Sequence, residues 1–214
     1  MVKFLLGVVL VGVLIFLPAG TLDFFNGWLF MALLFVPMFG AGIVMMCKNP
    51  SLLESRLRAK EKQNDQSLVV KLSGLMFIGG FVVAGLGYRF GWYLLPRSVS
   101  IGGAVVFLVA YLLYAEVLRE NTYLSRTIEV QEGQKVIDTG LYGIVRHPMY
   151  SVTLLLFLSM PIMLGSVYAF VIFLVYPLLI ARRIRGEEAF LEKELPGYRE
   201  YKQKVKYRMI PFVW

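Results

Sequence analysis

The chain has 214 residues, of which 58% are hydrophobic and only 17% are charged, and its formal net charge is +8. Soluble globular domains are less apolar and more charged, so this composition indicates a membrane protein and excludes an ordinary soluble enzyme. No basic face stands apart from the apolar stretches, so the positive charge does not predict nucleic-acid binding. We expect one membrane domain over residues 1–214, without a linker or an internal repeat.

Four apolar stretches in the first part of the chain approach the length of about 20 residues that a helix needs to cross a bilayer. They are residues 4–19, 26–47, 69–88 and 99–118. All four are predicted to be helical, because an open strand in lipid would leave its backbone polar groups unpaired. The first stretch is also typical of a secretory signal, but we expect it to be retained as a membrane helix.

The most polar run of the chain, Arg56–Gln66, lies between the second and third stretches. Asn49-Pro50-Ser51 ahead of it is typical of a helix start. A short amphipathic helix on the membrane surface is therefore predicted here.

The block Ser151–Ala181 has no ionisable side chain apart from two tyrosines. As one straight helix it would be roughly 46 Å long, well beyond a hydrocarbon core of ~30 Å. Four residues inside it can break a helix: Pro161, Gly165, Ser166 and Pro177. The block is therefore predicted to form a helical hairpin, with arms at about 150–164 and 167–181.

Lysine and arginine gather in the connections 48–71 and 119–146 and in the tail from residue 182. Because basic loops tend to stay in the cytoplasm, these three segments are predicted to face it. The hairpin fits this arrangement, since it returns the chain to the side that it left. We therefore expect an all-α polytopic protein of the inner membrane: four transmembrane helices, a C-terminal membrane hairpin, a cytoplasmic C-terminal helix and a cytoplasm-facing active site.

One polar cluster, Gly140–Tyr150, precedes the hairpin and contains the only histidine of the chain, His147. Pro148 suits the first turn of a helix, so Arg146 and His147 would sit at a helix N-terminus, where backbone N–H groups favour an anion. The alternative is an interface anchor, with Arg146 on a lipid phosphate and Tyr150 in the head-group layer. A metal site is not expected, because one histidine and one distant cysteine cannot fill a coordination shell.

A second polar cluster, Arg182–Glu188, follows the hairpin. Arg183 and Glu187 are four residues apart and so share one helix face. The alternative is an ordinary ion pair on a solvated helix, which contributes only a few tenths of a kcal/mol. If the hairpin forms, however, His147, Arg183 and Glu187 meet on one side of the membrane, and this meeting is the predicted active site.

The joint pattern resembles the isoprenylcysteine carboxyl methyltransferase family, in particular its prokaryotic membrane members, which are related to phospholipid methyltransferases. The matching segments are Val136–Tyr142, Arg146–Tyr150, Glu187-Glu188, Leu195–Tyr198 and Val205–Pro211, all within residues 126–214, and residues 49–58 also look similar. Three positions depart from the family pattern. Leu141 stands where proline is common, Gln134 where histidine is frequent, and Val152 where glycine often follows the tyrosine. The valine would narrow the route of a lipid to the methyl group.

The resemblance implies an integral membrane methyltransferase that binds S-adenosylmethionine in residues 126–214. The cofactor contacts that it implies are Gln134, Lys135, Val136, Ile137, Tyr142, Arg146, His147, Pro148, Met149, Tyr150, Glu187 and Glu188. Arg183 and Glu187 are the expected catalytic residues. Arg183 would bind the substrate by holding an acceptor carboxylate, and Glu187 would hold the positive or hydroxyl-bearing part of the cofactor, with Glu188 in reserve.

We expect methyl transfer to a lipophilic or lipidated acceptor, with carboxyl O-methylation preferred, because a carboxylate is ionised at neutral pH and needs only alignment and a cation. N-methylation of an amine phospholipid stays open and would require Glu187 or His147 as a general base. An NADPH-dependent membrane reductase also stays open as an alternative, since some sterol reductases look similar in their C-terminal half. A membrane scaffold without catalytic activity is the remaining alternative. The expected partners are the substrate and membrane lipids, and the oligomeric state is left open.

Overall fold

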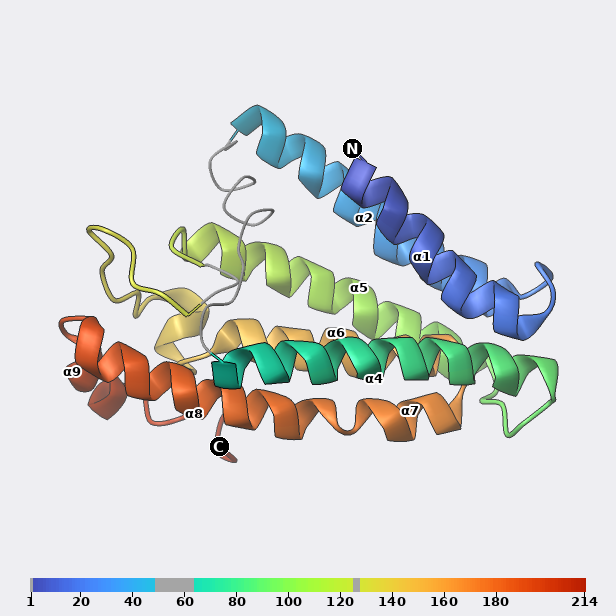
Figure 1. The fold of residues 1–214 in the computed structure, drawn as a ribbon. Coiled ribbons are helices and arrows are strands. Elements are labelled where there is room, and N and C mark those ends of the chain that lie inside the picture. The colour runs from blue at the N-terminus through green and yellow to red at the C-terminus, as the bar shows by residue number, and fades with distance from the viewer. Residues whose placement is uncertain (1, 49–63, 125–127) are drawn as a thin grey trace.

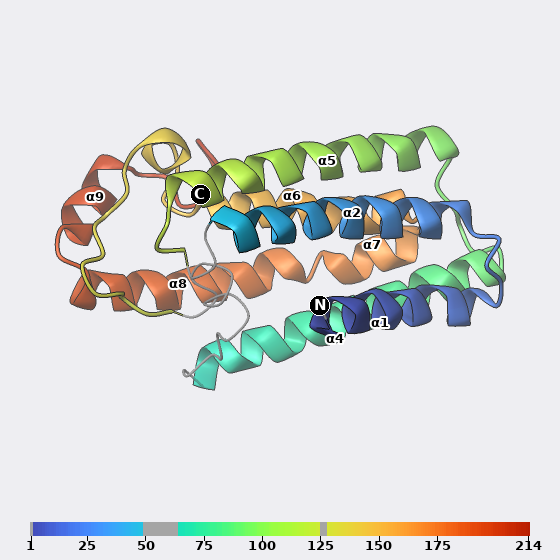
Figure 2. The same ribbon diagram turned by 90° about the horizontal axis from the view of Figure 1, so that it is seen from above.

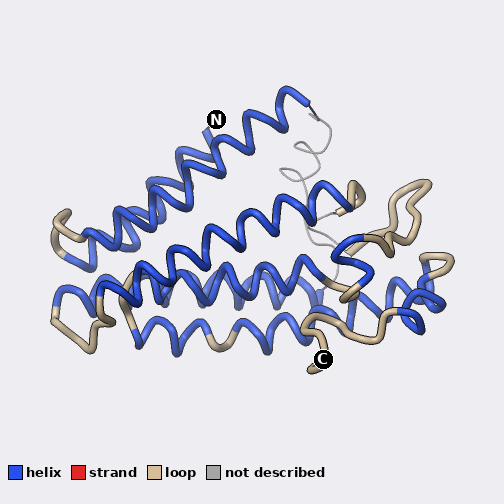
Figure 3. The backbone as a smooth tube through the Cα atoms, turned by 180° about the vertical axis from the view of Figure 1, so that it is seen from behind, coloured by secondary structure: helices blue, strands red, loops and turns tan. Residues whose placement is uncertain are grey.

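The computed structural model describes residues 2–48, 64–124 and 128–214, and this part of the chain is helical without a strand (Figure 3). The amphipathic helix predicted near Asn49 and the family-like residues 49–58 lie outside the described residues. The helices are α1 (Val2–Ala19), α2 (Phe25–Lys48), α4 (Asn64–Arg89), α5 (Arg97–Glu120), α6 (Pro148–Met163), α7 (Val167–Phe173), α8 (Tyr176–Glu194) and α9 (Tyr198–Lys204), with a 3₁₀ helix η1 (Gly140–Gly143) before α6 (Figure 1).

The long helices run roughly along one another and form a bundle (Figures 1 and 2). Helix α5 packs along α6, and α4 contacts α1, α7 and α8. Helices α1 and α2 diverge from the rest of the bundle with distance from the turn that joins them (Figure 1). One end of the bundle holds the turns α1–α2, α4–α5 and α6–α7, and the other end holds η1, α9 and the loop that follows α5.

Four described helices are long and apolar enough to cross a membrane: Phe25–Cys47, Ser67–Arg89, Arg97–Glu120 and Val167–Glu194. The first three match the predicted stretches 26–47, 69–88 and 99–118 to within two residues. The predicted first span, 4–19, is instead one of two shorter apolar helices, together with Pro148–Met163. The helices and the composition fit an integral membrane protein.

The chain reverses direction between α6 and α7. Gly165 has a φ of 76°, a conformation that glycine adopts without strain, and its carbonyl accepts a hydrogen bond from the Leu95 N–H at 2.9 Å. Ser166 caps α7, because its side chain accepts a hydrogen bond from the Ala169 N–H at 3.2 Å. The turn is thus fixed both locally and by the α4–α5 connection. Of the four possible break points, Pro161 is not used, since this proline lies inside α6.

The second arm of the predicted hairpin is longer than expected. It is interrupted at Leu174 and Val175, just before Pro177, and α8 then continues to Glu194 instead of ending near residue 181. The sequence after residue 181 is rich in arginine, glutamate and leucine, which favour helix, until Pro196-Gly197 stops it. One helix therefore carries both apolar residues of the bundle and the polar cluster Arg182–Glu188.

Glycines allow close packing at particular helix contacts. A Cβ atom added to Gly80 of α4 would overlap the ring of Phe173 in α7, and one added to Gly103 of α5 would lie 3.0 Å from the Met163 backbone nitrogen. Close approach of backbones at small residues is typical of helix contacts in membranes. A Cβ atom added to Gly79, the neighbour of Gly80, would meet no atom of another helix within 4 Å, so Gly79 plays no such part.

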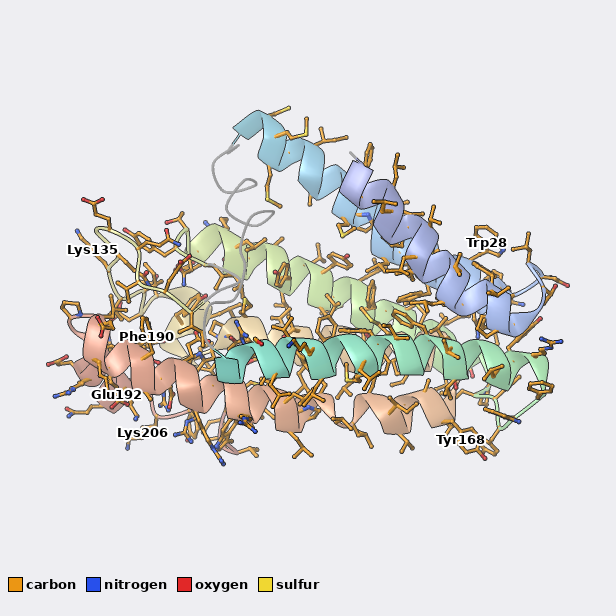
Figure 4. The ribbon with its side chains drawn as sticks, in the orientation of Figure 1. Trp28, Lys135, Tyr168, Phe190, Glu192 and Lys206 are labelled. Carbon is orange, nitrogen blue, oxygen red and sulfur yellow. The ribbon has the colours of Figure 1, made fainter. Side chains whose placement is uncertain are left out.

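Polar side chains concentrate at the end of the bundle that carries α9. Lys135, Glu192 and Lys206 lie at this end, whereas Trp28 and Tyr168 lie at the opposite end (Figure 4). The candidate site is formed where α6, α8 and α9 meet the loop after α5.

Candidate functional site

The start of α6 is tied to the C-terminal segment of the chain. The backbone N–H of Arg146 donates to the Tyr207 carbonyl at 2.9 Å, and that of His147 donates to the Arg208 carbonyl at 2.8 Å. Pro148 then occupies the first turn of α6, as predicted from its missing N–H. Residues 146–148 are consequently held from two directions and are almost fully buried.

Glu188 is a buried carboxylate, 3% exposed, with two cationic partners. Its Oε1 accepts a hydrogen bond from Arg146 Nε at 2.7 Å, and its Oε2 accepts one from Arg208 Nε at 2.9 Å. The Nη1 atom of Arg146 also donates to the Val205 and Lys206 carbonyls. A buried charge requires such partners, so this cluster fixes α8 to the C-terminal segment. Arg146 is therefore not a free cation for an anionic ligand, which corrects the expectation from the sequence.

Tyr150 connects Arg183 and Glu187. The Nε of Arg183 donates to the Tyr150 hydroxyl at 2.8 Å, and this hydroxyl donates to Glu187 Oε2 at 2.6 Å. His147, the residue just before α6, lies three positions before Tyr150, and its Nδ1 is 3.7 Å from Glu187 Oε1. The structure thus brings together His147, Arg183 and Glu187, the three residues whose meeting was predicted.

A further pair extends this contact between α6 and α8 into the apolar bundle. Tyr176 lies seven residues before Arg183 and so on the same face of α8. Its hydroxyl donates to Thr153 Oγ1 at 2.8 Å, and Thr153 lies one turn after Tyr150 on α6. Polar pairs therefore continue from the polar end of the bundle toward its apolar middle.

A cavity of about 810 Å³, counting its open mouth, borders these residues. The predicted site residues that line it are Gln134, Lys135, Val136, Ile137, Tyr142, Arg146, His147, Met149, Tyr150, Arg183 and Glu187. Pro148 and Glu188 do not line it, because Pro148 is packed inside the protein and Glu188 is turned to Arg146 and Arg208.

The rest of the lining was not predicted: Asn121, Tyr123, Leu124, Ile128, Glu129, Leu191, Leu195, Tyr198 and Tyr201. Three of these had a signal in the sequence, since Leu195 and Tyr198 belong to a segment that carries the family resemblance. Leu191 and Leu195 follow Glu187 at intervals of four residues and so continue its helix face. The residues that precede Gln134 carried no comparable pattern.

The loop over the cavity is held by its own hydrogen bonds. The Gln131 N–H donates to Gln134 Oε1 at 2.9 Å, and the Tyr123 hydroxyl donates to the carbonyl of Gly133, whose φ is 70°. Lys204 on α9 donates to Asp138 Oδ2 at 2.7 Å. This hydrogen bond, with the charge of Lys204, lowers the pKa of Asp138. The loop is therefore fastened to α9 beside the cavity.

Tyr142 is held between α5 and α9. Its hydroxyl accepts a hydrogen bond from Asn121 Nδ2 at 3.1 Å, and its carbonyl accepts one from the Tyr201 hydroxyl at 2.8 Å. Burial raises the pKa of Tyr142 to about 12, so this side chain is neutral at physiological pH. Tyr142 is consequently a lining residue of the cavity with a fixed position and no charge.

The cavity lining combines two kinds of residue. Arg183, Tyr150 and Glu187 are polar. Leu195, Tyr198 and Val136 belong to an apolar cluster. This division suits a ligand with a flat ring at one end and charged groups at the other. S-adenosylmethionine has this division, and the residues present fit it.

The fold and the cavity define a helical membrane protein with a polar site at one end of an apolar bundle. Residues 99–196 match the model of the phospholipid methyltransferase family. The match runs from α5 to just beyond α8 and includes both polar clusters. It begins before the predicted region 126–214 and ends before α9.

Two relatives are sterol reductases. The chain is 34% identical over 91 residues to the Delta(14)-sterol reductase TM7SF2 of Mus musculus. This aligned segment covers 41% of this chain and 22% of that protein. The chain is also 28% identical over 142 residues to the Delta(14)-sterol reductase of Arabidopsis thaliana. This aligned segment covers 58% of this chain and 38% of that protein. The chain thus matches less than two fifths of the length of either relative.

Proposed function

We propose that the protein is an S-adenosylmethionine-dependent membrane methyltransferase that acts on a lipophilic or lipidated acceptor. The observation that carries the proposal is the set Tyr150, Arg183 and Glu187, joined by hydrogen bonds on the wall of a cavity. This set lies inside the segment that matches the phospholipid methyltransferase family. Carboxyl O-methylation, as the resemblance to the isoprenylcysteine carboxyl methyltransferases suggests, is the preferred reaction.

The cofactor would supply an activated methyl group, which passes to the acceptor oxygen as the carbon–sulfur bond breaks and the sulfonium becomes a neutral thioether. Such a displacement needs chiefly alignment of the two reactants. Glu187, with 23% of its side chain exposed, can face the positive or hydroxyl-bearing part of the cofactor. The segment Gln134–Ile137 also lines the cavity and would contact the cofactor there.

Arg183 would hold the acceptor. A planar guanidinium binds a carboxylate through two parallel hydrogen bonds. Tyr150 keeps the Arg183 side chain in place through its hydroxyl. Thr153 and Tyr176 lie farther toward the apolar bundle, so an acceptor that enters between helices from the lipid would pass this pair before it reaches Arg183. We assign the open side of the cavity to the cytoplasm, on the strength of the basic connections.

The balance of charge around the cavity supports this cofactor. With Arg146 engaged by Glu188, the remaining charged lining residues are Lys135, Arg183, Glu129 and Glu187, two of each sign. A cofactor with one carboxylate, one ammonium and one sulfonium suits such a balance. A dinucleotide with several phosphate charges would require an excess of cations.

An NADPH-dependent membrane reductase is the second candidate, because the two relatives named above are sterol reductases. Binding of the two cofactors to the purified protein separates the candidates. We expect saturable binding of S-adenosylmethionine by calorimetry and none of NADPH. Binding of NADPH alone would overturn the methyltransferase proposal.

The site assignment is tested with two glutamates of the same helix. Glu187→Gln should weaken S-adenosylmethionine binding at least about tenfold, the usual effect of losing a charged hydrogen bond. Glu192→Gln is the matched control, since Glu192 pairs with Lys202 and does not line the cavity. Equal affinities for both variants would remove Glu187 from the site. Mass spectrometry of lipid extracts incubated with methyl-labelled cofactor would then identify the acceptor.

A further inference from the structure

The hydroxyl of Tyr198 is buried without a hydrogen-bond partner among the described residues. Tyr198 begins α9 and is 4% exposed. An unsatisfied buried hydroxyl costs about 1–3 kcal/mol, and buried polar groups in folded proteins are therefore almost always paired. A partner supplied from outside the chain would explain why a phenylalanine does not occupy this position.

The other tyrosines of the cavity lining have partners within the protein. Tyr123 donates to the Gly133 carbonyl, Tyr142 accepts from Asn121, and both Tyr150 and Tyr201 donate to other residues of the site. Among the described tyrosines of the lining, Tyr198 alone has an unsatisfied hydroxyl. The difference is specific to this residue and is not a general feature of the cavity wall.

Tyr198 has both apolar and charged neighbours. Its ring belongs to the apolar cluster with Leu195 and Val136. Burial raises the pKa of the Tyr198 hydroxyl, and the nearby carboxylates of Glu188 and Glu187 raise it further. The hydroxyl therefore stays protonated at physiological pH, and Tyr198 is one of the residues that line the cavity. In this position it can donate a hydrogen bond to a ligand.

We infer that Tyr198 is a further cofactor-binding residue, whose hydroxyl donates a hydrogen bond to the nucleoside half of S-adenosylmethionine. The apolar walls beside it, Leu191, Leu195 and Val136, suit the flat adenine ring. The ring nitrogens and the ribose oxygens of a nucleoside accept hydrogen bonds of this kind. The inference rests on the proposed function, and it adds a residue of α9, beyond the segment that matches the family model.

Tyr198→Phe tests the inference because stability and affinity should change in opposite directions. Removal of the unsatisfied hydroxyl should leave the Tm of the cofactor-free protein unchanged or raise it. The Kd for S-adenosylmethionine should rise about five- to twentyfold, the effect of one lost hydrogen bond. The Kd for S-adenosylhomocysteine should rise by the same factor, because the contact is to the nucleoside and not to the methyl group.

Two further variants serve as controls. Tyr201→Phe should lower the Tm, since its hydroxyl donates to the Tyr142 carbonyl, and so it calibrates a structural effect. Tyr168→Phe should alter neither quantity, because Tyr168 is exposed at the opposite end of the bundle (Figure 4). All titrations use the full chain in detergent micelles.

An unchanged Kd for Tyr198→Phe would overturn the inference and would indicate a trapped water as the partner. A weaker affinity with a Tm loss equal to that of Tyr201→Phe would also overturn it, because the effect would then arise from the fold. An effect on S-adenosylmethionine alone would assign the change to the sulfonium charge and contradict the nucleoside contact. Failure of the wild-type protein to bind either compound would refute the proposed function itself, and the inference with it.

Discussion

The Nε atom of Arg183 donates a hydrogen bond to the hydroxyl of Tyr150 at 2.8 Å, although the two residues are 33 positions apart in the chain. The same hydroxyl donates to Glu187 at 2.6 Å. One oxygen atom therefore sets the distance between a cation and a carboxylate. In the proposed enzyme these two groups hold the acceptor and the cofactor, so Tyr150 controls their alignment.

Tyr150→Phe removes this connection and keeps the ring. We expect kcat for methyl transfer to fall at least about tenfold, because small losses of alignment have large effects on a displacement reaction. The KM for the acceptor should rise less than kcat falls. The measurement is transfer of labelled methyl groups at varied acceptor concentration, with Tyr168→Phe as the control. Wild-type kcat in Tyr150→Phe would contradict the alignment role.

Glu187 and Glu188 are neighbours in the sequence with different expected roles. Glu188→Gln breaks a buried cluster with Arg146 and Arg208, in which the Glu188 side chain is 3% exposed. Loss of one partner of a buried ion pair destabilises a protein by about 3–5 kcal/mol. We therefore expect a clearly lower Tm for Glu188→Gln and a nearly unchanged Tm for Glu187→Gln. Thermal unfolding in detergent, followed by fluorescence, provides the comparison.

The same pair should show the reverse order in cofactor binding. Glu187→Gln should lose affinity for S-adenosylmethionine, whereas Glu188→Gln, measured well below its Tm, should keep most of it. A stable Glu188→Gln variant that cannot bind the cofactor would contradict this division between a structural and a binding carboxylate.

The sequence was sufficient to predict the meeting of His147, Arg183 and Glu187. The composition required membrane helices, the apolar block between the two clusters was too long for one crossing, and Gly165 supplied the reversal. Physical limits of length and backbone conformation thus determined this part of the site. The lengths of the helices beyond the block depended on weaker propensities, and so the end of α8 was misjudged.

The partners of Arg146 could not be predicted in this way. Glu188 is 42 residues away and Arg208 is farther along the chain, and no sequence spacing indicates which buried charges pair. An arginine before a helix start is equally compatible with a bound anion, a lipid phosphate or a buried carboxylate. The choice depends on the path of the C-terminal segment, which places the Val205 and Lys206 carbonyls on the same guanidinium.

The pH dependence of the rate distinguishes the two methyl-transfer reactions. A carboxylate acceptor is ionised throughout roughly pH 6–9, so the rate should be nearly flat over this range. An amine acceptor must lose a proton first, so its rate should climb steeply. Tyr142, whose pKa burial raises to about 12, stays neutral here and adds no step of its own. An S-prenylated cysteine with a free carboxyl and vesicles of phosphatidylethanolamine are the two probes.

We expect methylation of the prenylated cysteine with the flat profile. Methylation of phosphatidylethanolamine alone, with a rate that rises with pH, would replace the carboxyl reaction by N-methylation and leave the cofactor assignment intact.

Two adjacent glycines of α4 test how the bundle positions α8. A Cβ atom on Gly80 would overlap the ring of Phe173, which is 1% exposed and confined by Phe77 and Phe81. Gly80→Ala should therefore destabilise the protein by about 1–3 kcal/mol, because the ring has no room to move. Gly79→Ala is the control and should be neutral or slightly stabilising, since alanine favours helix and nothing lies within 4 Å.

The consequence for function follows from the connection between α7 and α8. Phe173 is the last residue of α7, and α8 begins at Tyr176 and carries Arg183. A displaced Phe173 would shift α8 along α6 and disturb the hydrogen bond from Arg183 to Tyr150. Gly80→Ala should therefore reduce kcat more than cofactor affinity at a temperature where the variant is folded. Equal Tm values for the two alanine variants would show that α4 and α7 do not depend on close contact at this point.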